Sequence, residues 1–178
     1  ACVRFILAAF LTLCTWTLGW GQRVHLFPDD QLVFRDMIAH VENNLVRMGA
    51  TWSGEVAFTL QEDGMWDEVH LHRGFSSSAL DIAYTVREGQ LVLGDTHFSD
   101  GILYTFFEGQ IFMGDSTFPM DVAYTLREER PAFPSRSGAP TFGVYKEDSR
   151  AWTDRVAVVE GVATPAQLYA LLSAAGLL

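Results

Sequence analysis

Apolar and polar residues alternate in the middle of the chain, and one alternating pattern occurs four times. The copies are residues 56–60, 82–86, 102–106 and 122–126, each with large apolar residues at its first, third and fifth positions. A period of two built from β-branched and aromatic residues is typical of strands, whose side chains point alternately to opposite faces. We therefore predict a strand at each copy.

The last three copies are spaced by twenty residues, and Glu88-Gly89-Gln90 recurs as Glu108-Gly109-Gln110. A Glu-Gly pair between two alternating segments predicts a two-residue hairpin turn, with glycine supplying a positive φ. Each repeat is then two antiparallel strands and two turns. The predicted cross-strand pairs are Arg87 with Gln90, Val86 with Leu91, Tyr84 with Leu93, Phe106 with Ile111 and Tyr104 with Met113.

Further elements are predicted on either side of these repeats. Residues 66–72 form the return strand of a first, less regular hairpin, and residues 141–145 and 155–160 form two later strands. Thr164 and Pro165 begin a last helix that runs to Ala175. The predicted fold class is mainly β: an antiparallel meander of about eight strands, either a half-open sheet or a barrel, with a short C-terminal helix.

Residues 22–49 have a different spacing, which predicts a connector and an amphipathic helix. Pro28, Asp29 and Asp30 suit the first turn of a helix, and Gly49 is placed to end it. Apolar residues follow at helical intervals, at Phe34, Met37, Ile38, Val41, Leu45 and Met48. We expect this helix to pack on the sheet, with a membrane-surface or partner-helix role as the alternative.

The first residues are almost entirely apolar and predict a transmembrane anchor over residues 1–21. The apolar run from Val3 to Trp20 would rise about 27 Å as a helix, close to the thickness of a bilayer core. A cleaved signal peptide and a lipoprotein are the alternatives, but Trp20 between two glycines is a poor cleavage site. The predicted anchor residues are Phe5, Leu7, Phe10, Leu11, Trp16 and Trp20. The β domain then occupies residues 50–178.

The net charge and the cysteine content limit the kinds of partner that the protein could bind and the cellular compartment in which we expect it. The net charge is -10 with only 12 Lys and Arg residues, which argues against nucleic acid because phosphate binding depends on basic side chains. Both cysteines, Cys2 and Cys14, lie in the apolar segment, so the remaining chain has no disulfide framework. We expect a bacterial inner-membrane protein with its N-terminus in the cytoplasm and its β domain in the periplasm.

The candidates for chemistry each have a simpler interpretation. Glu68, His70 and His72 share one strand face, as metal ligands on a strand could, but such residues are common on solvated faces. Asp95 and Asp115 occupy equivalent repeat positions, where Gly-Asp makes ordinary turns. The sequence has neither a nucleophile motif nor a glycine-rich phosphate loop. We expect no catalytic residue, no metal, no cofactor and no enzyme activity.

Aromatic residues give a candidate partner surface at Phe107 and Phe112. If Tyr104 and Phe106 face the core, these two phenylalanines emerge on the opposite face, where neighbouring repeats have Arg87 and Arg127. An exposed aromatic patch would mark a contact with a partner or with lipid. The alternative is that a covering loop, such as residues 131–140, buries it.

Three functions of different class are compatible with these features. The first is a non-catalytic, single-pass accessory subunit of a larger membrane complex, for example a photosynthetic or respiratory one, with other subunits and membrane lipid as partners. The second is a periplasmic lipid or hydrophobic-ligand binding protein, with Tyr84, Tyr104 and Tyr124 lining the groove. The third is a minor pseudopilin-like component, although Pro28 interrupts the long helix that this requires.

Overall fold

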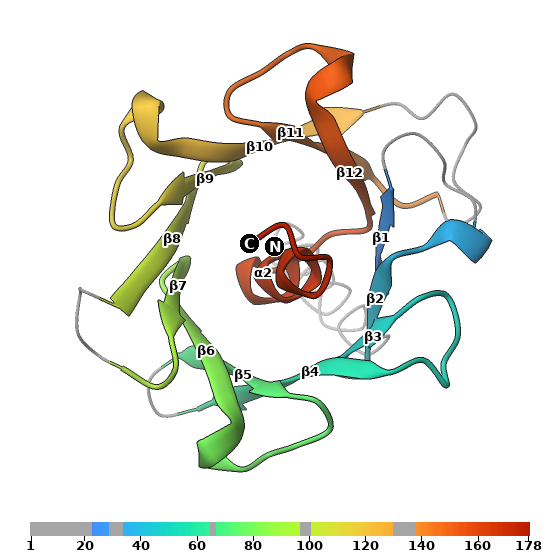
Figure 1. Ribbon diagram of the computed structural model, residues 1–178, viewed down its shortest axis with the longest axis vertical. Helices are drawn as coiled ribbons and strands as arrows, with labels where there is room; N and C mark the ends of the chain where they lie inside the picture. Colours follow the sequence, from blue (N-terminus) through green and yellow to red (C-terminus); the bar gives the residue numbers. More distant parts are fainter. Residues whose placement is uncertain (1–22, 29–33, 65–66, 97–100, 130–137) are drawn as a thin grey trace, which may run out of the picture.

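The computed structural model describes residues 23–28, 34–64, 67–96, 101–129 and 138–178, and twelve antiparallel strands in them form one closed barrel (Figure 1). The strands are β1 (Val24–Pro28), β2 (Ala39–Glu42), β3 (Leu45–Met48), β4 (Val56–Asp63), β5 (Glu68–Arg73), β6 (Ile82–Arg87), β7 (Gln90–Leu93), β8 (Ile102–Phe107), β9 (Gln110–Met113), β10 (Val122–Glu129), β11 (Thr141–Lys146) and β12 (Arg155–Glu160).

The repeats fold into the hairpins that the alternation predicts. Tyr84 pairs with Leu93 and Arg87 with Gln90 in β6 and β7, and Tyr104 pairs with Met113 in β8 and β9. Glu88 and Gly89 have φ angles of 47° and 80°, so both residues of this turn are in the left-handed region. Such a turn matches the twist of the strands that it joins. The register prediction is therefore confirmed.

The number of strands differs from the prediction of about eight, and the sheet is a closed barrel, where the prediction left open a half-open sheet or a barrel. The sheet has twelve strands, and it closes because β1 pairs with β2 on one side and with β12 on the other. Closure removes both edges, where unpaired backbone groups would otherwise face solvent. The first and last strands of the barrel thus form one antiparallel pair that joins the two ends of the sheet.

The amphipathic helix predicted within residues 22–49 is wrong. This region contains β1, a single 3-10 turn η1 (Phe34–Asp36), β2 and β3. Asn43 and Asn44 have φ angles of 51° and 62°, so they form a two-residue hairpin turn between β2 and β3. The apolar spacing fits a helix and two short strands equally well, and the asparagine pair decides in favour of the hairpin.

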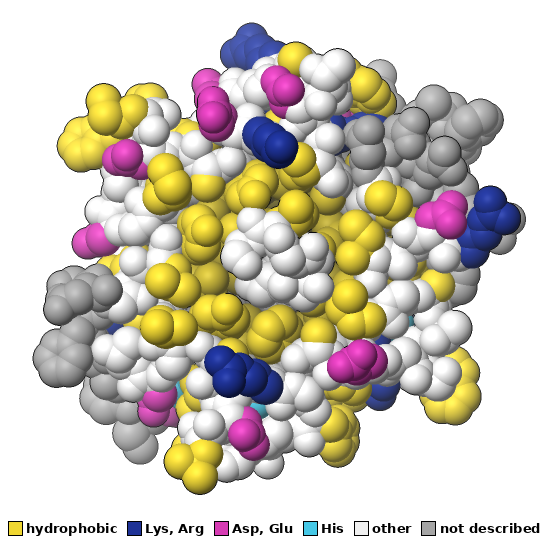
Figure 2. All heavy atoms as spheres, in the orientation of Figure 1, with side chains coloured by type: hydrophobic (Ala, Val, Ile, Leu, Met, Phe, Trp, Pro, Cys, Tyr) yellow, Lys and Arg dark blue, Asp and Glu magenta, His cyan; other side chains and the backbone are white. Residues whose placement is uncertain are grey.

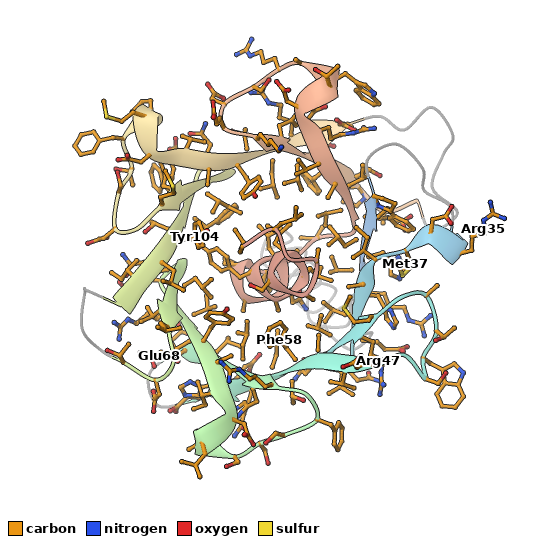
Figure 3. All side chains as sticks on the ribbon, viewed as in Figure 1. Arg35, Met37, Arg47, Phe58, Glu68 and Tyr104 are labelled. Carbon is orange, nitrogen blue, oxygen red and sulfur yellow. The ribbon has the colours of Figure 1, made fainter. Side chains whose placement is uncertain are left out.

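The barrel is filled by one helix, α2 (Pro165–Ala174), which begins with a reciprocal cap between Thr164 and Gln167. Its buried residues lie on all sides: Ala166, Leu168, Tyr169, Ala170, Leu171 and Leu172. A helix that is apolar all round needs a complete apolar wall, and the barrel provides one. Every strand contributes an inward side chain; Phe58 of β4 and Tyr104 of β8 point toward α2, whereas Arg35 and Met37 lie outside the wall (Figure 3).

The predicted membrane anchor, residues 1–21, lies outside the described residues, as do Phe5, Leu7, Phe10, Leu11, Trp16 and Trp20. Within the described ranges, no helix has both the length and the apolar character to cross a bilayer. The predicted fold with a transmembrane helix is therefore wrong for this structure, and so is the single-pass inner-membrane localisation that depended on it. The α-helix of the described chain is α2, inside the barrel.

Loops between successive hairpins project from the wall like petals, and we call them petal loops (Figure 1). Four are described in full: residues 49–55, 74–81, 114–121 and 147–154. Three are braced by a serine that donates to an aspartate five residues later: Ser76 to Asp81, Ser116 to Asp121 and Ser149 to Asp154, at 2.6, 2.5 and 2.5 Å. In the same three loops a wall threonine donates to the first carbonyl, Thr59 to Gly74, Thr105 to Gly114 and Thr125 to Glu147, at 2.7, 2.8 and 2.8 Å. In loop 49–55 the first carbonyl, that of Gly49, is instead bonded by Nδ1 of His40 at 2.8 Å.

The barrel therefore has two different ends. The turn end contains the hairpin turns such as Glu88-Gly89 and the beginning of α2. The petal end contains the petal loops and the C-terminus, because the hydroxyl of Tyr124, beside the petal loops, donates to the carbonyl of Leu177 at 2.7 Å. The C-terminus lies at the centre of the view in Figure 1.

Candidate functional site

An open groove of about 840 Å³ lies at the petal end, between the mouth of the barrel and two petal loops. Tyr104 and Tyr124 form its inner side, and Met113 and Met120 form its apolar wall. The side chains of Met113 and Met120 are 54% and 87% exposed, so large apolar groups face solvent inside a concave surface. Concave, mostly apolar sites of this size are typical of small-molecule binding sites.

Hydrophobic side chains surround the centre of this face, and charged side chains lie toward its margin (Figure 2). The repeat explains the apolar ring. Leu93 and Met113 occupy equivalent positions at the ends of β7 and β9, opposite the inward tyrosines Tyr84 and Tyr104, and both are 54% exposed. The last inward residue of each hairpin therefore remains uncovered beyond the end of α2.

Tyr124 is a polar group of the groove that is bound to the C-terminal segment of the described chain. Its hydroxyl donates to the Leu177 carbonyl, which connects β10 to the residues after α2. Burial, with a smaller contribution from the neighbouring Tyr104, raises the pKa of the Tyr124 phenol above its usual value of 10.0. Tyr124 is therefore neutral at physiological pH and serves as a hydrogen-bonding group.

The outer rim of the groove is polar and mainly acidic. Glu147, Asp148 and Asp154 line it together with Lys146. Asp148 forms an ion pair of 3.0 Å with Arg127, and Asp154 accepts the hydrogen bond from Ser149. The rim therefore places more negative than positive charge beside an apolar interior.

The two residues of the predicted partner surface do not share one environment. Phe107, at the end of β8, is 51% exposed, whereas Phe112 in β9 is buried. Phe112 does point away from α2, because it pairs with Thr105, whose hydroxyl bonds the carbonyl that begins a petal loop. On the outer face of β8 and β9, the side chain near the petal loops is therefore buried and the one near the hairpin turn is exposed to solvent.

The histidines of β5 are held by neighbours within the protein. Nδ1 of His72 donates to the Ser78 carbonyl at 2.9 Å, and Nδ1 of His70 lies 3.1 Å from the Thr85 hydroxyl. A carboxylate oxygen of Glu68 lies 3.7 Å from a guanidinium nitrogen of Arg87. In the part of the chain that the structure describes, no group of three histidine, cysteine or acidic side chains is arranged to hold a metal ion.

Asp95 and Asp115 are exposed in petal loops, and Asp115 accepts a hydrogen bond of 2.8 Å from Gln90. This arrangement agrees with a role in turns. Sequence reasoning named Tyr104 and Tyr124 as groove residues but missed Met113, Met120 and Lys146. The repeat could have indicated Met113, because it pairs with Tyr104, whereas Met120 and Lys146 come from other loops and strands.

The described chain is thus a closed antiparallel barrel around a central helix, with loops radiating from its wall. A family model described as "6-fold beta flower protein" matches residues 27–133, more than half of the chain, and the chain therefore belongs to this family. No curated protein matches it significantly. An X-ray structure of a protein from Arabidopsis thaliana is similar at 15% identity, with a TM-score of 0.41, and the match covers 88% of this chain and 89% of that one.

Proposed function

We propose that the protein is a non-catalytic binding module that holds an elongated, uncharged apolar ligand in the groove at the petal end. The observation on which this proposal depends is the groove itself, in which Met113 and Met120 are exposed beside Tyr104 and Tyr124. Covering an apolar side chain of this size contributes about 1.5 to 3 kcal/mol. A ligand that lies across both methionines would therefore gain substantial binding energy.

The shape and chemistry of the groove favour a flexible or extended ligand. Methionine side chains are unbranched and polarizable, so they adapt to ligands of different outline. The volume of about 840 Å³ exceeds what a single small ring would fill. The tyrosine rings offer flat apolar faces, and their hydroxyls can bond a polar end of the ligand.

The charges of the rim favour an uncharged ligand over an anionic one. The rim has three acidic residues, Glu147, Asp148 and Asp154, and one lysine, Lys146. The whole chain has a net charge of -10. A fatty-acid anion would approach three carboxylates for one ammonium group, whereas a neutral chain meets no such repulsion. We therefore choose a neutral hydrocarbon chain with a hydroxyl or ester end as the ligand class.

Titration of the full chain with the neutral dye N-phenyl-1-naphthylamine, followed by fluorescence, tests this proposal. Monolaurin below its micellar concentration should displace the dye, and laurate should displace it at least ten-fold less effectively. The double variant Met113→Gln/Met120→Gln should weaken dye binding at least ten-fold. Its matched control is Leu93→Gln/Leu80→Gln, where Leu93 is equivalent to Met113 one repeat earlier and Leu80 is equivalent to Met120 two repeats earlier, and it should change binding less than two-fold. Absence of saturable binding, or equal loss in both double variants, would overturn the proposal.

A partner-binding role, as in the accessory subunit predicted from sequence, is the second candidate. Large apolar side chains stand exposed on the petal loops, among them Trp52, Phe75, Leu80 and Phe118. Exposed apolar groups of this kind are frequent in protein contacts. Co-purification of a stoichiometric partner that is lost in Phe75→Ser/Leu80→Ser but retained in Met113→Gln/Met120→Gln would favour this candidate over ligand binding.

A further inference from the structure

A second apolar pocket lies at the turn end, away from the groove, where α2 begins. It has a volume of about 190 Å³ and lies between the first turn of the helix and the wall formed by β8, β10, β11 and β12. Pro165 and Leu168 form its helix side, and Phe106, Leu126, Phe142 and Val159 form its wall side. Each of these side chains is hydrophobic.

Backbone geometry explains why this space is not filled by side chains. Gly161, which lines the pocket, has a φ of 108°, and a Cβ atom there would lie 2.8 Å from the backbone oxygen of Arg23. The chain therefore requires glycine at this corner. Gly109 of a hairpin turn lines the pocket with a φ of 80°. Two glycines thus line the pocket without contributing a side chain, and Val162, which also lines it, is 52% exposed.

The pocket volume sets the size of an occupant. An apolar cavity of about 150 Å³ stays dry and takes up benzene or xenon, because water finds no hydrogen-bond partner in it. The pocket here is slightly larger and has a lining of the same chemical kind. A single six-membered or fused ring fills such a space, whereas the long chain proposed for the groove does not.

The charge of the lining sets the chemistry of the occupant. Glu128 is the one ionisable residue among those that line the pocket, so an anionic ring would meet a carboxylate without a compensating cation in the lining. Complementarity therefore favours an uncharged ring.

We propose that this pocket is a second binding site, independent of the groove, for a small uncharged ring such as benzene or indole. The ring stacks against Phe106 and Phe142 and contacts Leu168 of α2, so it bridges the helix and the wall. A ligand that bridges them holds α2 in the barrel, and binding is coupled to the stability of the helix.

Titration of the 15N-labelled full chain with indole, followed by NMR, tests the proposal. Saturable shifts should be largest at the amides of Gly109, Val162 and Ala163. The variant Ala163→Leu, which extends a side chain into the pocket, should weaken indole binding at least ten-fold and leave dye binding in the groove within two-fold. Val162→Thr, of similar shape at the exposed lip, is the matched control and should change indole binding less than three-fold.

A crystal of the unmodified protein under xenon gives a second test if Ala163→Leu fails to fold. Xenon should occupy the space between Leu168 and Phe106. Indole-3-carboxylate should bind at least ten-fold more weakly than indole because of Glu128. The proposal would be overturned if the NMR shifts did not saturate or were spread over the whole barrel. It would also be overturned if the carboxylate bound as tightly as indole, or if xenon were absent from the pocket. Loss of groove binding alone would leave this site intact, because the two sites share no lining residue.

Discussion

The hydroxyl of Tyr169 donates a hydrogen bond of 2.9 Å to the carbonyl oxygen of Gly89, and this bond ties the central helix to a hairpin turn of the wall. Tyr169 is completely buried, and the same carbonyl also accepts the backbone N–H of Phe106 at 2.8 Å. One oxygen thus joins α2, the turn between β6 and β7, and strand β8. The carbonyl oxygen of Gly89 therefore fixes both the position of α2 in the barrel and the pairing of β8 with the neighbouring hairpin.

Replacing Tyr169 by Phe tests the contribution of that bond. The variant retains the ring but removes the donor, so we expect the free energy of unfolding to fall by about 1 kcal/mol. Urea denaturation followed by circular dichroism measures this change. Tyr84→Phe is the control, because Tyr84 is half-exposed, and it should cost less than about 0.5 kcal/mol. Equal losses in both variants would contradict the assigned role.

Alkaline pH should destabilise the protein in a defined window. Burial, followed by the hydrogen bond to Glu129, raises the pKa of Tyr145 to about 12, and burial also raises the pKa of Tyr169. Between pH 10 and 12 the unfolded chain has released protons that the folded chain retains. Stability is therefore fully present below pH 10 and falls above it, by up to about 1.4 kcal/mol per pH unit for each group.

Urea midpoints measured from pH 8 to 11.5 would reveal this dependence. Tyr145→Phe removes one of the two groups, so its stability should decline less steeply above pH 10 than that of the unmodified protein. Identical slopes for the two proteins would exclude Tyr145 as a source of the effect.

The two equivalent turn glycines should differ in their response to substitution. Gly89 and Gly109 have the same φ of 80°, but a Cβ atom would lie 2.9 Å from the Phe106 oxygen at Gly89 and 3.6 Å from the Leu126 oxygen at Gly109. Gly109→Ala should cost about 1 kcal/mol, for the left-handed conformation alone. Gly89→Ala adds a backbone clash and should cost at least about 1 kcal/mol more. Chemical denaturation of both variants checks the order, and a reversed order would contradict the argument.

The ion pair between Arg155 and Glu129 should contribute more than a surface pair of similar length. Its N–O distance is 2.6 Å, and its side chains are only 3% and 14% exposed. Glu129→Gln leaves the buried guanidinium without that carboxylate, so the free energy of unfolding should fall by about 2 to 3 kcal/mol.

Glu42→Gln is the matched control, because Glu42 pairs with Arg23 at 2.7 Å and the arginine is 67% exposed. This change should cost less than about 1 kcal/mol. Thermal unfolding with a van't Hoff analysis compares the two variants, and similar losses would show that burial does not strengthen the Arg155 pair.

The sequence predicted the repeated hairpins well, because both the alternation and the Glu-Gly turns are local signals. It did not decide between a half-open sheet and a barrel, since the pairing of His25 with Glu160 joins residues 135 positions apart. It placed an amphipathic helix within residues 22–49 because short strands separated by a tight turn can reproduce helical spacing. The C-terminal helix was predicted, but its place inside the barrel was not, although Ala166, Tyr169 and Ala170 extend its apolar surface beyond one stripe.

The candidate site was predicted in part. Strand alternation puts Tyr104 and Tyr124 on the inner face, and that inference needed no tertiary information. Met120 and Lys146 reach the groove through a petal loop and through β11, and their approach depends on how loops fold over a closed wall. The functional assignment to an accessory subunit stays a prediction, because nothing in the fold tests it.

Pairing of β1 with β12 has a consequence for synthesis. A ribosome releases the first strand long before its partner β12, so during translation β1 has no neighbour on one side and its edge is open to other chains. The helix that fills the interior emerges later still. Closure of the barrel around its helix must then wait until α2 has also left the exit tunnel, and we expect chaperones to bind the nascent chain until then.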